Sequence, residues 1–248
     1  MKVRLDKLVA ERGLAASRER AQALILAGRV LVEEQKQTKP GHAVEATANL
    51  RLLGEDLRYV SRGGLKLEGA LAHWKIDLTA RACMDIGTST GGFTDCMLQH
   101  GAASVLAVDT GYGQIAESLR RDPRVSLMER TNARHLAPGQ LPAGIEFFSM
   151  DVSFISATLV LPAVVAAARA ELKQELRAVV LVKPQFEVGR TNVGKGGIVR
   201  NPEAHAFAVE RVIETAKAIG AREIESIDSP ITGVEGNREF LLSLRWVG

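Results

Sequence analysis

The 248-residue sequence lacks the features that several protein classes require. It contains only two cysteines, Cys83 and Cys96, so it cannot build a disulfide scaffold, and no Cys-x-x-Cys spacing favours a zinc site. Both cysteines are expected to be small buried hydrophobic residues. No run of about 18 apolar residues occurs, so no membrane-spanning helix is predicted. The first residues include Asp6 and lack an apolar run, which predicts that no signal peptide is present and that the protein stays in the cytoplasm.

Two further absences concern the organisation of the chain. No internal repeat or low-complexity segment is visible, and the fingerprint G-x-G-x-x-G of dinucleotide-binding folds is missing. The net charge of +3 is small, but residues 1–60 alone hold 11 Lys or Arg against 8 Asp or Glu. Because this excess accounts for the whole net charge, the rest of the chain is balanced. We therefore expect a basic module with its linker at residues 1–60, in front of a neutral body at residues 61–248.

The first 50 residues carry the pattern of two short helices followed by strands. Gly13 ends the first predicted helix, Ser17 is the expected N-cap of the second, and Gly28 has the position of a helix C′ residue. Residues 29–32 then alternate like a strand, and residues 39–41 predict a turn. The apolar positions of the two helices are Leu5, Leu8, Val9, Ala21, Leu24 and Ile25.

Basic side chains gather on this predicted module. Any one of them alone is most simply a solvated surface residue, whereas an arginine-rich helix pair taken as a set is a candidate for binding RNA phosphates. The candidate RNA-binding residues are Arg4, Lys7, Arg12, Arg18, Arg20, Lys36 and Lys39.

The same stretch resembles the RNA-binding domain first recognised in ribosomal protein S4, which implies a small α+β fold. It departs from that pattern at the hairpin, where Glu34-Gln35 stands in place of the Asn-Gly of many relatives, so the type of turn is left open. The residues that carry the resemblance are Arg4-Leu5-Asp6-Lys7, Gly13-Leu14, Ser17-Arg18, Ala21, Leu24-Ile25, Gly28, Val30 and Lys39-Pro40.

The rest of the chain has the pattern of an α/β fold. A helix is predicted to begin near Leu65, and strand-like apolar runs then alternate with helical patterns near residues 92–100, 115–121, 156–172 and 203–219. This alternation favours a doubly wound, mostly parallel seven-stranded sheet covered on both faces. The predicted strands are Ala82–Ile86, Ser104–Val108, Val125–Met128, Ile145–Met150, Val179–Val182, Glu223–Ile227 and Phe240–Trp246.

The strongest local signal is the segment from Asp85 to Thr94, which follows an apolar strand and opens a helix with the spacing D-x-G-x-x-x-G-G. Glycines there let the backbone approach a ligand closely. Asp85 would repel a pyrophosphate and suits a cationic cofactor end, such as the amino or sulfonium group of S-adenosylmethionine. Asp109 ends the next strand, where doubly wound folds place a carboxylate for ribose hydroxyls, and Asn132 is expected at the adenine edge. The predicted cofactor residues are Asp85, Gly87, Thr88, Ser89, Gly91, Gly92, Phe93, Asp109, Asn132 and Asp151.

Polar residues also follow later strands. Asp151 and Lys183 come after the fourth and fifth predicted strands, so both should face the crevice beyond the carboxyl ends of the sheet. Over nearly its whole length the chain resembles the FtsJ-like ribose 2′-O-methyltransferases, and specifically the TlyA family. The matching motifs are Arg62-Gly63-Gly64-Leu65-Lys66-Leu67, Asp85 to Thr94, Asp151-Val152-Ser153-Phe154-Ile155-Ser156, Lys183-Pro184-Gln185-Phe186-Glu187 and Gly194-Lys195-Gly196-Gly197.

This resemblance implies a Rossmann-like class I methyltransferase domain that uses S-adenosylmethionine to methylate ribose 2′-hydroxyls of cytidines in ribosomal RNA. It implies a catalytic tetrad of Lys66, Asp151, Lys183 and Glu239, with Glu235 left open as an alternative to Glu239. Lys183 is then the general base, because the second cation, Lys66, disfavours its protonation, while the two acids orient the lysines. No metal is required. The expected partners are ribosomal RNA or ribosomal subunits, and the protein is expected to be a monomer or a homodimer.

Two other interpretations remain open. Members of the same family have carried a haemolysin label, and residues 156–172 are apolar, although Pro162, Arg169 and Glu171 favour a buried crossover helix over a membrane-active one. The second alternative is a non-catalytic RNA-binding protein with a methyltransferase fold, which the intact tetrad argues against. The glycine-rich residues 189–200 predict either a loop that closes on RNA or a surface loop without a binding role.

Overall fold

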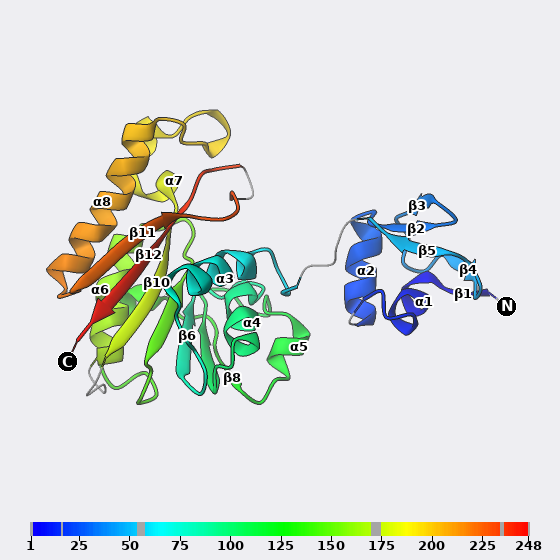
Figure 1. Cartoon of the computed structure of the whole chain (residues 1–248), viewed down its shortest axis with the longest axis horizontal. Helices are drawn as coiled ribbons and strands as arrows, with labels where there is room; N and C mark the ends of the chain where they lie inside the picture. Colours follow the sequence, from blue (N-terminus) through cyan, green and yellow to red (C-terminus); the bar gives the residue numbers. More distant parts are fainter. Residues whose placement is uncertain (1, 16, 54–57, 170–174, 234–235, 248) are drawn as a thin grey trace. The chain divides into compact units, whose positions relative to one another are not determined.

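The chain forms two compact units, Met1–Leu57 and Arg58–Gly248, each with its own apolar core (Figure 1). Part of the linker expected within residues 1–60, at residues 54–57, lies outside the described residues. Tyr59 is buried in the core of the second unit. The computed structural model describes residues 2–15, 17–53, 58–169, 175–233 and 236–247.

The first unit contains two helices and short antiparallel strands. β1 pairs with β4, and β2 lies between β3 and β5. The elements are β1 (Lys2–Arg4), α1 (Leu5–Glu11), α2 (Arg18–Leu26), β2 (Val30–Val32), β3 (Gln35–Gln37), β4 (Ala43–Glu45) and β5 (Leu50–Leu52). The predicted apolar positions of both helices are buried in one cluster with the strands.

The ends of α2 agree with the sequence. Ser17 Oγ accepts a hydrogen bond from the amide of Arg20 at 3.1 Å, which satisfies one of the free donors at the helix start. Gly28 follows the C-cap residue Ala27 with a φ of +64°, the left-handed conformation that helix C′ residues commonly take. The predicted N-cap and C′ residues are therefore confirmed.

The hairpin between β2 and β3 turns on Glu33 and Glu34, one residue earlier than the sequence predicted. Both residues have positive φ angles, 48° and 62°, as a two-residue type I′ turn requires of its central positions. Side-chain contacts hold this turn in place of the usual Asn-Gly. Glu33 accepts a hydrogen bond from the amide of Asn49 at 2.7 Å, and Glu34 pairs with Arg51 at 2.6 Å.

The second unit is built on a seven-stranded sheet with the strand order β11-β12-β10-β9-β6-β7-β8. β12 runs antiparallel to β10 and β11, whereas the pairs from β10 to β8 are parallel. The doubly wound, mostly parallel sheet predicted from the sequence is therefore confirmed. The strands are β6 (Ala82–Ile86), β7 (Ser104–Val108), β8 (Val125–Met128), β9 (Phe147–Met150), β10 (Leu176–Val182), β11 (Glu223–Asp228) and β12 (Phe240–Trp246).

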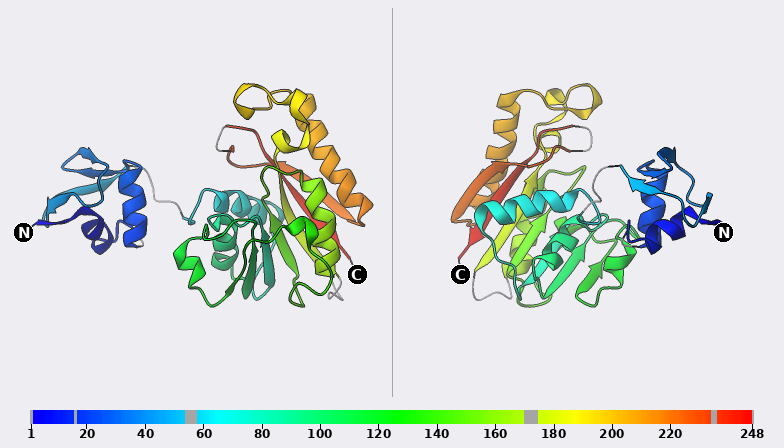
Figure 2. Two further views of the ribbon diagram at one scale, coloured as in Figure 1. Left: turned by 180° about the vertical axis from the view of Figure 1, so that it is seen from behind. Right: turned by 45° about the vertical axis from the view of Figure 1, so that its right-hand side comes forward.

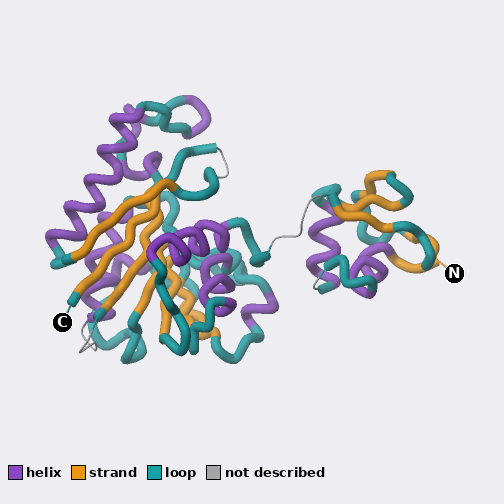
Figure 3. The backbone as a smooth tube through the Cα atoms, viewed as in Figure 1, coloured by secondary structure: helices purple, strands orange, loops and turns teal. Residues whose placement is uncertain are grey.

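Helices cover both faces of this sheet (Figures 2 and 3). α6 and α8 pack on one face and α3 and α4 on the other, so the sheet separates two apolar clusters. Alternate side chains of β10 enter different clusters: Val180 and Val182 face the first, and Val179 and Leu181 the second. The helices are α3 (Gly63–Trp74), α4 (Gly92–Gln99), α5 (Glu117–Arg120), α6 (Ala157–Arg169), α7 (Pro184–Glu187) and α8 (Pro202–Ala218).

The strand order reverses beside β6, because the chain moves outward from β6 to β8 and then returns to β9 on the other side of β6. Open α/β sheets bind ligands beyond the carboxyl ends of the strands at such a reversal. Ile86 pairs with Met150, and Val182 pairs with Phe240. The residues that follow β6, β9 and β10 and the residue that precedes β12 therefore share one edge of the sheet.

The position of Tyr59 makes a test of the second unit possible. In a chain that starts at Arg58, Tyr59→Ala should lower the free energy of unfolding by about 3–5 kcal/mol, because it empties a fully buried ring site. Tyr112→Ala, which removes a ring that is 66% exposed, should change it by less than about 0.5 kcal/mol. Chemical denaturation measures both values. Equal effects of the two substitutions would contradict the placement of Tyr59.

Candidate active site

Asp85 anchors the turn that follows β6. Its side chain is fully buried, and its Oδ2 accepts hydrogen bonds from the amide and the hydroxyl of Thr94 at 3.0 and 2.7 Å. Its Oδ1 accepts one from the hydroxyl of Ser149 at 3.1 Å. Burial, reinforced by the nearby charge of Asp151, raises the pKa of Asp85 to about 7 despite these donors. Asp85 thus ties β6, α4 and β9 together from beneath the turn.

The turn itself depends on the absence of a side chain at Gly87. This residue has a φ of +83°, and a Cβ atom there would lie 2.4 Å from the carbonyl oxygen of Asp151. The close approach lets the segments after β6 and β9 lie against each other. Gly92 allows α3 to pack closely against the start of α4, since a Cβ at Gly92 would lie 2.9 Å from the amide nitrogen of Gly64.

Asp109, directly after β7, joins two loops. Its Oδ2 accepts a hydrogen bond from the amide of Ser89 at 2.7 Å, and its Oδ1 accepts one from the amide of Gly111 at 2.7 Å. The carboxylate is therefore fixed at the position where doubly wound folds meet a ribose. Each oxygen keeps further lone pairs for a ligand.

A cavity of about 300 Å³ lies beyond the carboxyl ends of β6, β7 and β9. Five predicted cofactor residues line it: Gly87, Ser89, Asp109, Asn132 and Asp151. Among the described residues around it there are two aspartates and no lysine or arginine, which suits a nucleoside with a cationic group better than a phosphate. The other predicted cofactor residues, which lie outside this lining, are Asp85, Thr88, Gly91, Gly92 and Phe93.

Lys183 and Asp151 meet at the edge of this cavity. Lys183 Nζ lies 2.6 Å from Asp151 Oδ1 and donates a hydrogen bond to Ser153 Oγ at 2.7 Å. The contact with Asp151 is an ion pair, so the Lys183 ammonium compensates the charge of the Asp151 carboxylate. Asp151 also lines the cofactor cavity.

Lys66 and Glu239 form a second, more deeply buried pair. Lys66 comes from α3 and Glu239 precedes β12, and their charged atoms lie 2.5 Å apart. The side chains are 10% and 3% exposed. The alternative candidate, Glu235, lies outside the described residues. Since Val182 pairs with Phe240, the neighbouring residues Lys183 and Glu239 bring the two pairs to the same sheet edge.

A second cavity, of about 580 Å³, shares Phe154 and Ile155 with the lining of the first. Phe154 is 93% exposed there, and its ring centroid lies 5.5 Å from that of Phe186. Phe154 also has a φ of +64°, a conformation that costs a bulky residue energy and that clusters at functional sites. The cavity thus has an exposed aromatic pair in its lining.

Part of the glycine-rich segment at residues 189–200 is held by Asn237. The side chain of Asn237 is buried, accepts a hydrogen bond from the amide of Val199 at 3.0 Å and donates one to the carbonyl of Gly197 at 2.9 Å. The end of the segment is therefore fixed to the loop that carries Glu239. Gly189 and Val193, near its start, line the second cavity.

The predicted RNA-binding cations of the first unit differ in what they contact. Arg4 and Arg18 both bind the carboxylate of Asp6, and Lys7 lies 3.5 Å from Glu11. Arg12 is committed to the fold, because it donates hydrogen bonds to the carbonyls of Ala46 and Ala48 at 2.5 and 2.6 Å. Arg20 also has a partner of its own, and the described, exposed side chains that remain are those of Lys36 and Lys39.

Sequence reasoning missed three residues that support the site. Ser153 contacts Lys183, and it stood in a motif directly after a predicted strand, which is a usable signal. Thr94 ends the Asp85 to Thr94 segment, so the local motif already contained it. Ser149 holds Asp85 from a distant part of the sequence, so no local pattern announces it.

A doubly wound sheet with an acidic, nucleoside-sized cavity at its reversal, next to lysine–carboxylate pairs, defines a methyltransferase with a nucleoside cofactor. The model of the FtsJ-like methyltransferases matches residues 59–246, and that of the S4 domain matches residues 3–49. The chain therefore belongs to the FtsJ-like methyltransferase family and carries an S4 domain in front. The residues lining the cavity fit the cofactor of this class, S-adenosylmethionine, as the sequence predicted.

Three relatives are similar over nearly the whole chain. The Bacillus subtilis protein YqxC is 49% identical over 248 residues, which cover 100% of this chain and 87% of YqxC. TlyA of Mycobacterium tuberculosis, named a 16S/23S rRNA (cytidine-2′-O)-methyltransferase, is 44% identical and the match covers 98% of this chain and 90% of TlyA. A solved Streptococcus thermophilus protein with a hemolysin name has a TM-score of 0.75 and 43% identity, covering 99% and 89%.

The apolar segment considered for membrane activity is α6. It has 13 residues with Pro162 inside, and its apolar side chains pack on the sheet. No helix within the described ranges has the length and apolar character needed to cross a membrane.

The raised pKa of Asp85 predicts a pH dependence of stability. Between about pH 4 and 7 the folded chain holds a proton that the unfolded chain releases, so the free energy of unfolding should fall as pH rises, by up to about 4 kcal/mol. Asp85→Asn keeps the shape and removes the titration, so it should remove this part of the slope. Urea denaturation at pH 5 and pH 8 measures the free energy of unfolding of both proteins, and the difference between the two pH values gives the slope.

Asp77→Asn is the matched control. Asp77 is exposed, and its pKa is lowered by a hydrogen bond from Thr79, so it titrates below this window and the substitution should leave the slope unchanged. An Asp85→Asn protein with the same slope as the unsubstituted chain would show that Asp85 is charged throughout.

Proposed function

We propose that this protein transfers a methyl group from S-adenosylmethionine to the ribose 2′-hydroxyl of a cytidine in ribosomal RNA. The observation that carries the proposal is the meeting of Lys183 and Asp151 beside the cofactor cavity, with Lys66 and Glu239 on the same sheet edge. The acceptor follows the name of the 44% identical TlyA, and the S4 domain supplies an RNA-binding unit. The four-residue set supports an active enzyme over a non-catalytic RNA-binding protein.

The lining of the cavity suggests how the cofactor lies. Asp109 would accept hydrogen bonds from the ribose hydroxyls, Asn132 would lie at the adenine end and Asp151 at the cationic end. Bound S-adenosylmethionine would supply the methyl group from its sulfonium sulfur, which would keep the electron pair of the broken bond. Asp85 supports this arrangement from below by fixing the turn at Gly87.

The 2′-hydroxyl is a poor nucleophile until its proton is drawn off. We assign Lys183 to accept that proton, and Asp151, 2.6 Å away, to stabilise the resulting ammonium. Ser153 fixes the direction of the Lys183 side chain. The main contribution of the site is alignment of the oxygen, methyl carbon and sulfur for in-line transfer.

Lys66 and Glu239 balance each other's charge in a buried position. Without Glu239, Lys66 would be an uncompensated cation at the sheet edge, which is strongly destabilising. The pair lies on the same sheet edge as Lys183. We assign it to orienting the ribose.

The second cavity suits the base of the target nucleotide. Phe154 and Phe186 offer an exposed aromatic surface on which an unstacked base can lie. Phe186 follows Lys183 closely in the chain, so a base held on this surface would bring its ribose toward the lysine. The two cavities share Phe154 and Ile155, so cofactor and substrate would meet at these residues.

Incubation with ribosomal subunits and a methyl-labelled cofactor, followed by mapping of the modified nucleotide, tests the function. Lys183→Ala should lower the rate of transfer by about 10²-fold or more while cofactor affinity, measured by calorimetry, is retained. Lys217→Ala removes an exposed lysine of α8 and should leave the rate unchanged. Full transfer by Lys183→Ala would disprove the general-base role, and label on a base instead of a ribose would disprove the acceptor.

Phe154→Ala tests the base-binding cavity. Loss of one base–aromatic stack costs about 1–3 kcal/mol, so KM for the RNA should rise roughly tenfold. The matched control is Phe207→Ala, which removes a ring of α8 that is 55% exposed. An unchanged KM in the Phe154→Ala enzyme would place the base elsewhere.

A further inference from the structure

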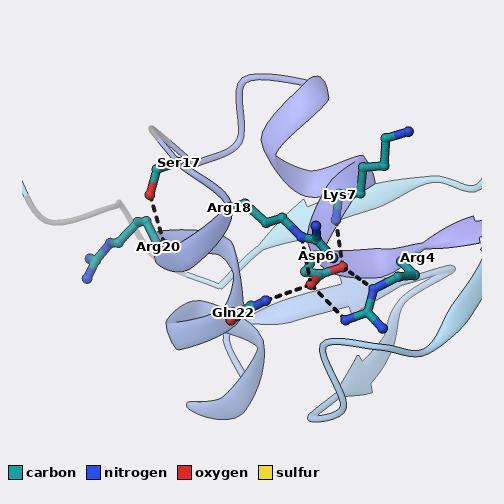
Figure 4. A network of polar contacts seen from close by, with 7 residues as sticks. All are labelled: Arg4, Asp6, Lys7, Ser17, Arg18, Arg20 and Gln22. Atoms are coloured by element: carbon teal, nitrogen blue, oxygen red, sulfur yellow. Dashed lines mark hydrogen bonds and ion pairs between the residues drawn. The ribbon is translucent and has the colours of Figure 1, made fainter. Parts of the chain in front are cut away.

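Asp6 is a fully buried carboxylate at the start of α1, in the unit whose surface carries the predicted RNA-binding cations. Figure 4 shows the side chains that converge on it. Arg4 donates two hydrogen bonds to it, from Nε at 3.1 Å and from Nη2 at 2.9 Å. Arg18 Nε and Gln22 Nε2 donate to its Oδ2 at 3.1 and 2.8 Å, and the amide of Lys7 donates to its Oδ1 at 2.9 Å.

These donors keep Asp6 charged. The hydrogen bond from Arg4 holds the pKa of Asp6 far below its usual range, against the opposing effect of burial. Charge-assisted hydrogen bonds of this kind are shorter and stronger than neutral ones and fix the planar guanidinium group in one orientation. One edge of each guanidinium group is therefore bound to Asp6.

The other ends of the same guanidinium groups reach solvent. The side chain of Arg4 is 52% exposed and that of Arg18 is 49% exposed. Asp6 engages Nε and Nη2 of Arg4 but only Nε of Arg18, so it leaves the remaining N–H groups unused. These N–H groups belong to residues at the starts of α1 and α2, and both guanidinium groups are bound to the same carboxylate.

The turn at residues 39–42 completes this surface. It is fixed to α1, because the amide of Leu5 donates to the carbonyl of His42 at 2.8 Å and the amide of Asp6 donates to that of Pro40 at 3.0 Å. Gly41 leaves room for Arg4, since a Cβ there would lie 3.1 Å from Arg4 Nη1. The exposed cation Lys39 belongs to the same turn.

We infer that Asp6 is a positioning residue for RNA binding: it holds Arg4 and Arg18 as a two-armed clamp for the phosphate backbone of RNA. This inference rests on the proposed function, which makes RNA the substrate. It separates Arg4 and Arg18 from Arg12, whose guanidinium is committed to backbone carbonyls of its own unit. Phosphate recognition by arginine depends on orientation, because its donors match two phosphate oxygens at once.

The positioning role predicts a change in RNA affinity opposite to the ordinary effect of charge. Removing a negative charge from an RNA-binding surface ordinarily strengthens binding, since RNA is a polyanion. Asp6→Asn removes one negative charge and frees both arginines, so the positioning role predicts weaker binding. In a chain that already carries Arg4→Ala and Arg18→Ala, only the charge effect remains, and the same substitution should leave binding unchanged or strengthen it.

The experiment measures binding of a fluorescently labelled RNA stem-loop to the full chain at several salt concentrations. At about 0.1 M salt we expect Asp6→Asn to weaken binding about tenfold and to reduce the salt slope by about one to two phosphate contacts. Weakening of the same size in the Arg4→Ala/Arg18→Ala background would mean that Asp6 acts only on the fold, which overturns the inference. Equal or tighter binding by the Asp6→Asn protein also overturns it.

If Asp6→Asn unfolds the first unit, Arg18→Lys tests the positioning role of Asp6 instead. It keeps the charge, but an ammonium cannot bind Asp6 and a phosphate with a planar fork, so binding should weaken several-fold. Arg51→Lys, at an exposed arginine paired with Glu34, is the matched control and should bind like the unsubstituted chain. Equal binding by the Arg18→Lys and Arg51→Lys proteins overturns the inference. An unsubstituted chain without affinity for RNA would refute the proposed function itself.

Discussion

The direction of β12 is the constraint on which the active site depends. Six strands of the sheet run in one direction and have their carboxyl ends at the ligand edge. β12 runs antiparallel to both of its neighbours, so its amino end lies at that edge. A residue placed just before β12 therefore lies beside residues placed just after β9 and β10. This is why Glu239 precedes a strand while Asp151 and Lys183 follow strands. A parallel β12 would carry Glu239 to the opposite edge of the sheet, away from Lys66.

Much of this arrangement was accessible from the sequence, because buried parallel strands read as apolar runs and polar residues at their ends stand out. The boundaries were less accessible. β10 begins at Leu176 and not at Val179, since Arg177 interrupts the apolar run although it lies within the strand. β9 begins at Phe147, two residues after the predicted start, because pairing with β6 begins there. Strand limits follow from neighbouring strands, which a local pattern does not contain.

The side-chain partners were the least predictable part. Arg4, Arg12 and Arg18 look alike in the sequence, as exposed arginines near the ends of two short helices. In the structure Arg12 is bound to carbonyls of Ala46 and Ala48, whereas the other two share a carboxylate. The difference arises from acceptors that lie more than thirty positions away for Arg12 and within the helix pair for Arg4 and Arg18. Only tertiary structure divides cations that are bound to backbone carbonyls from cations whose guanidinium groups still reach solvent.

The buried acids illustrate how the donors around a carboxylate decide its role. Asp6 and Asp85 are both fully buried, and burial alone would neutralise either of them. Asp6 is met by two guanidinium groups, so it keeps its charge and becomes a fixed point that orients cations. Asp85 is met by hydroxyls and an amide, which carry no charge, so its pKa rises and it serves as an internal fastening beneath the cofactor turn. Composition does not reveal this difference, because Asp6, which orients two arginines, and Asp85, which holds a turn, count equally in the formal net charge.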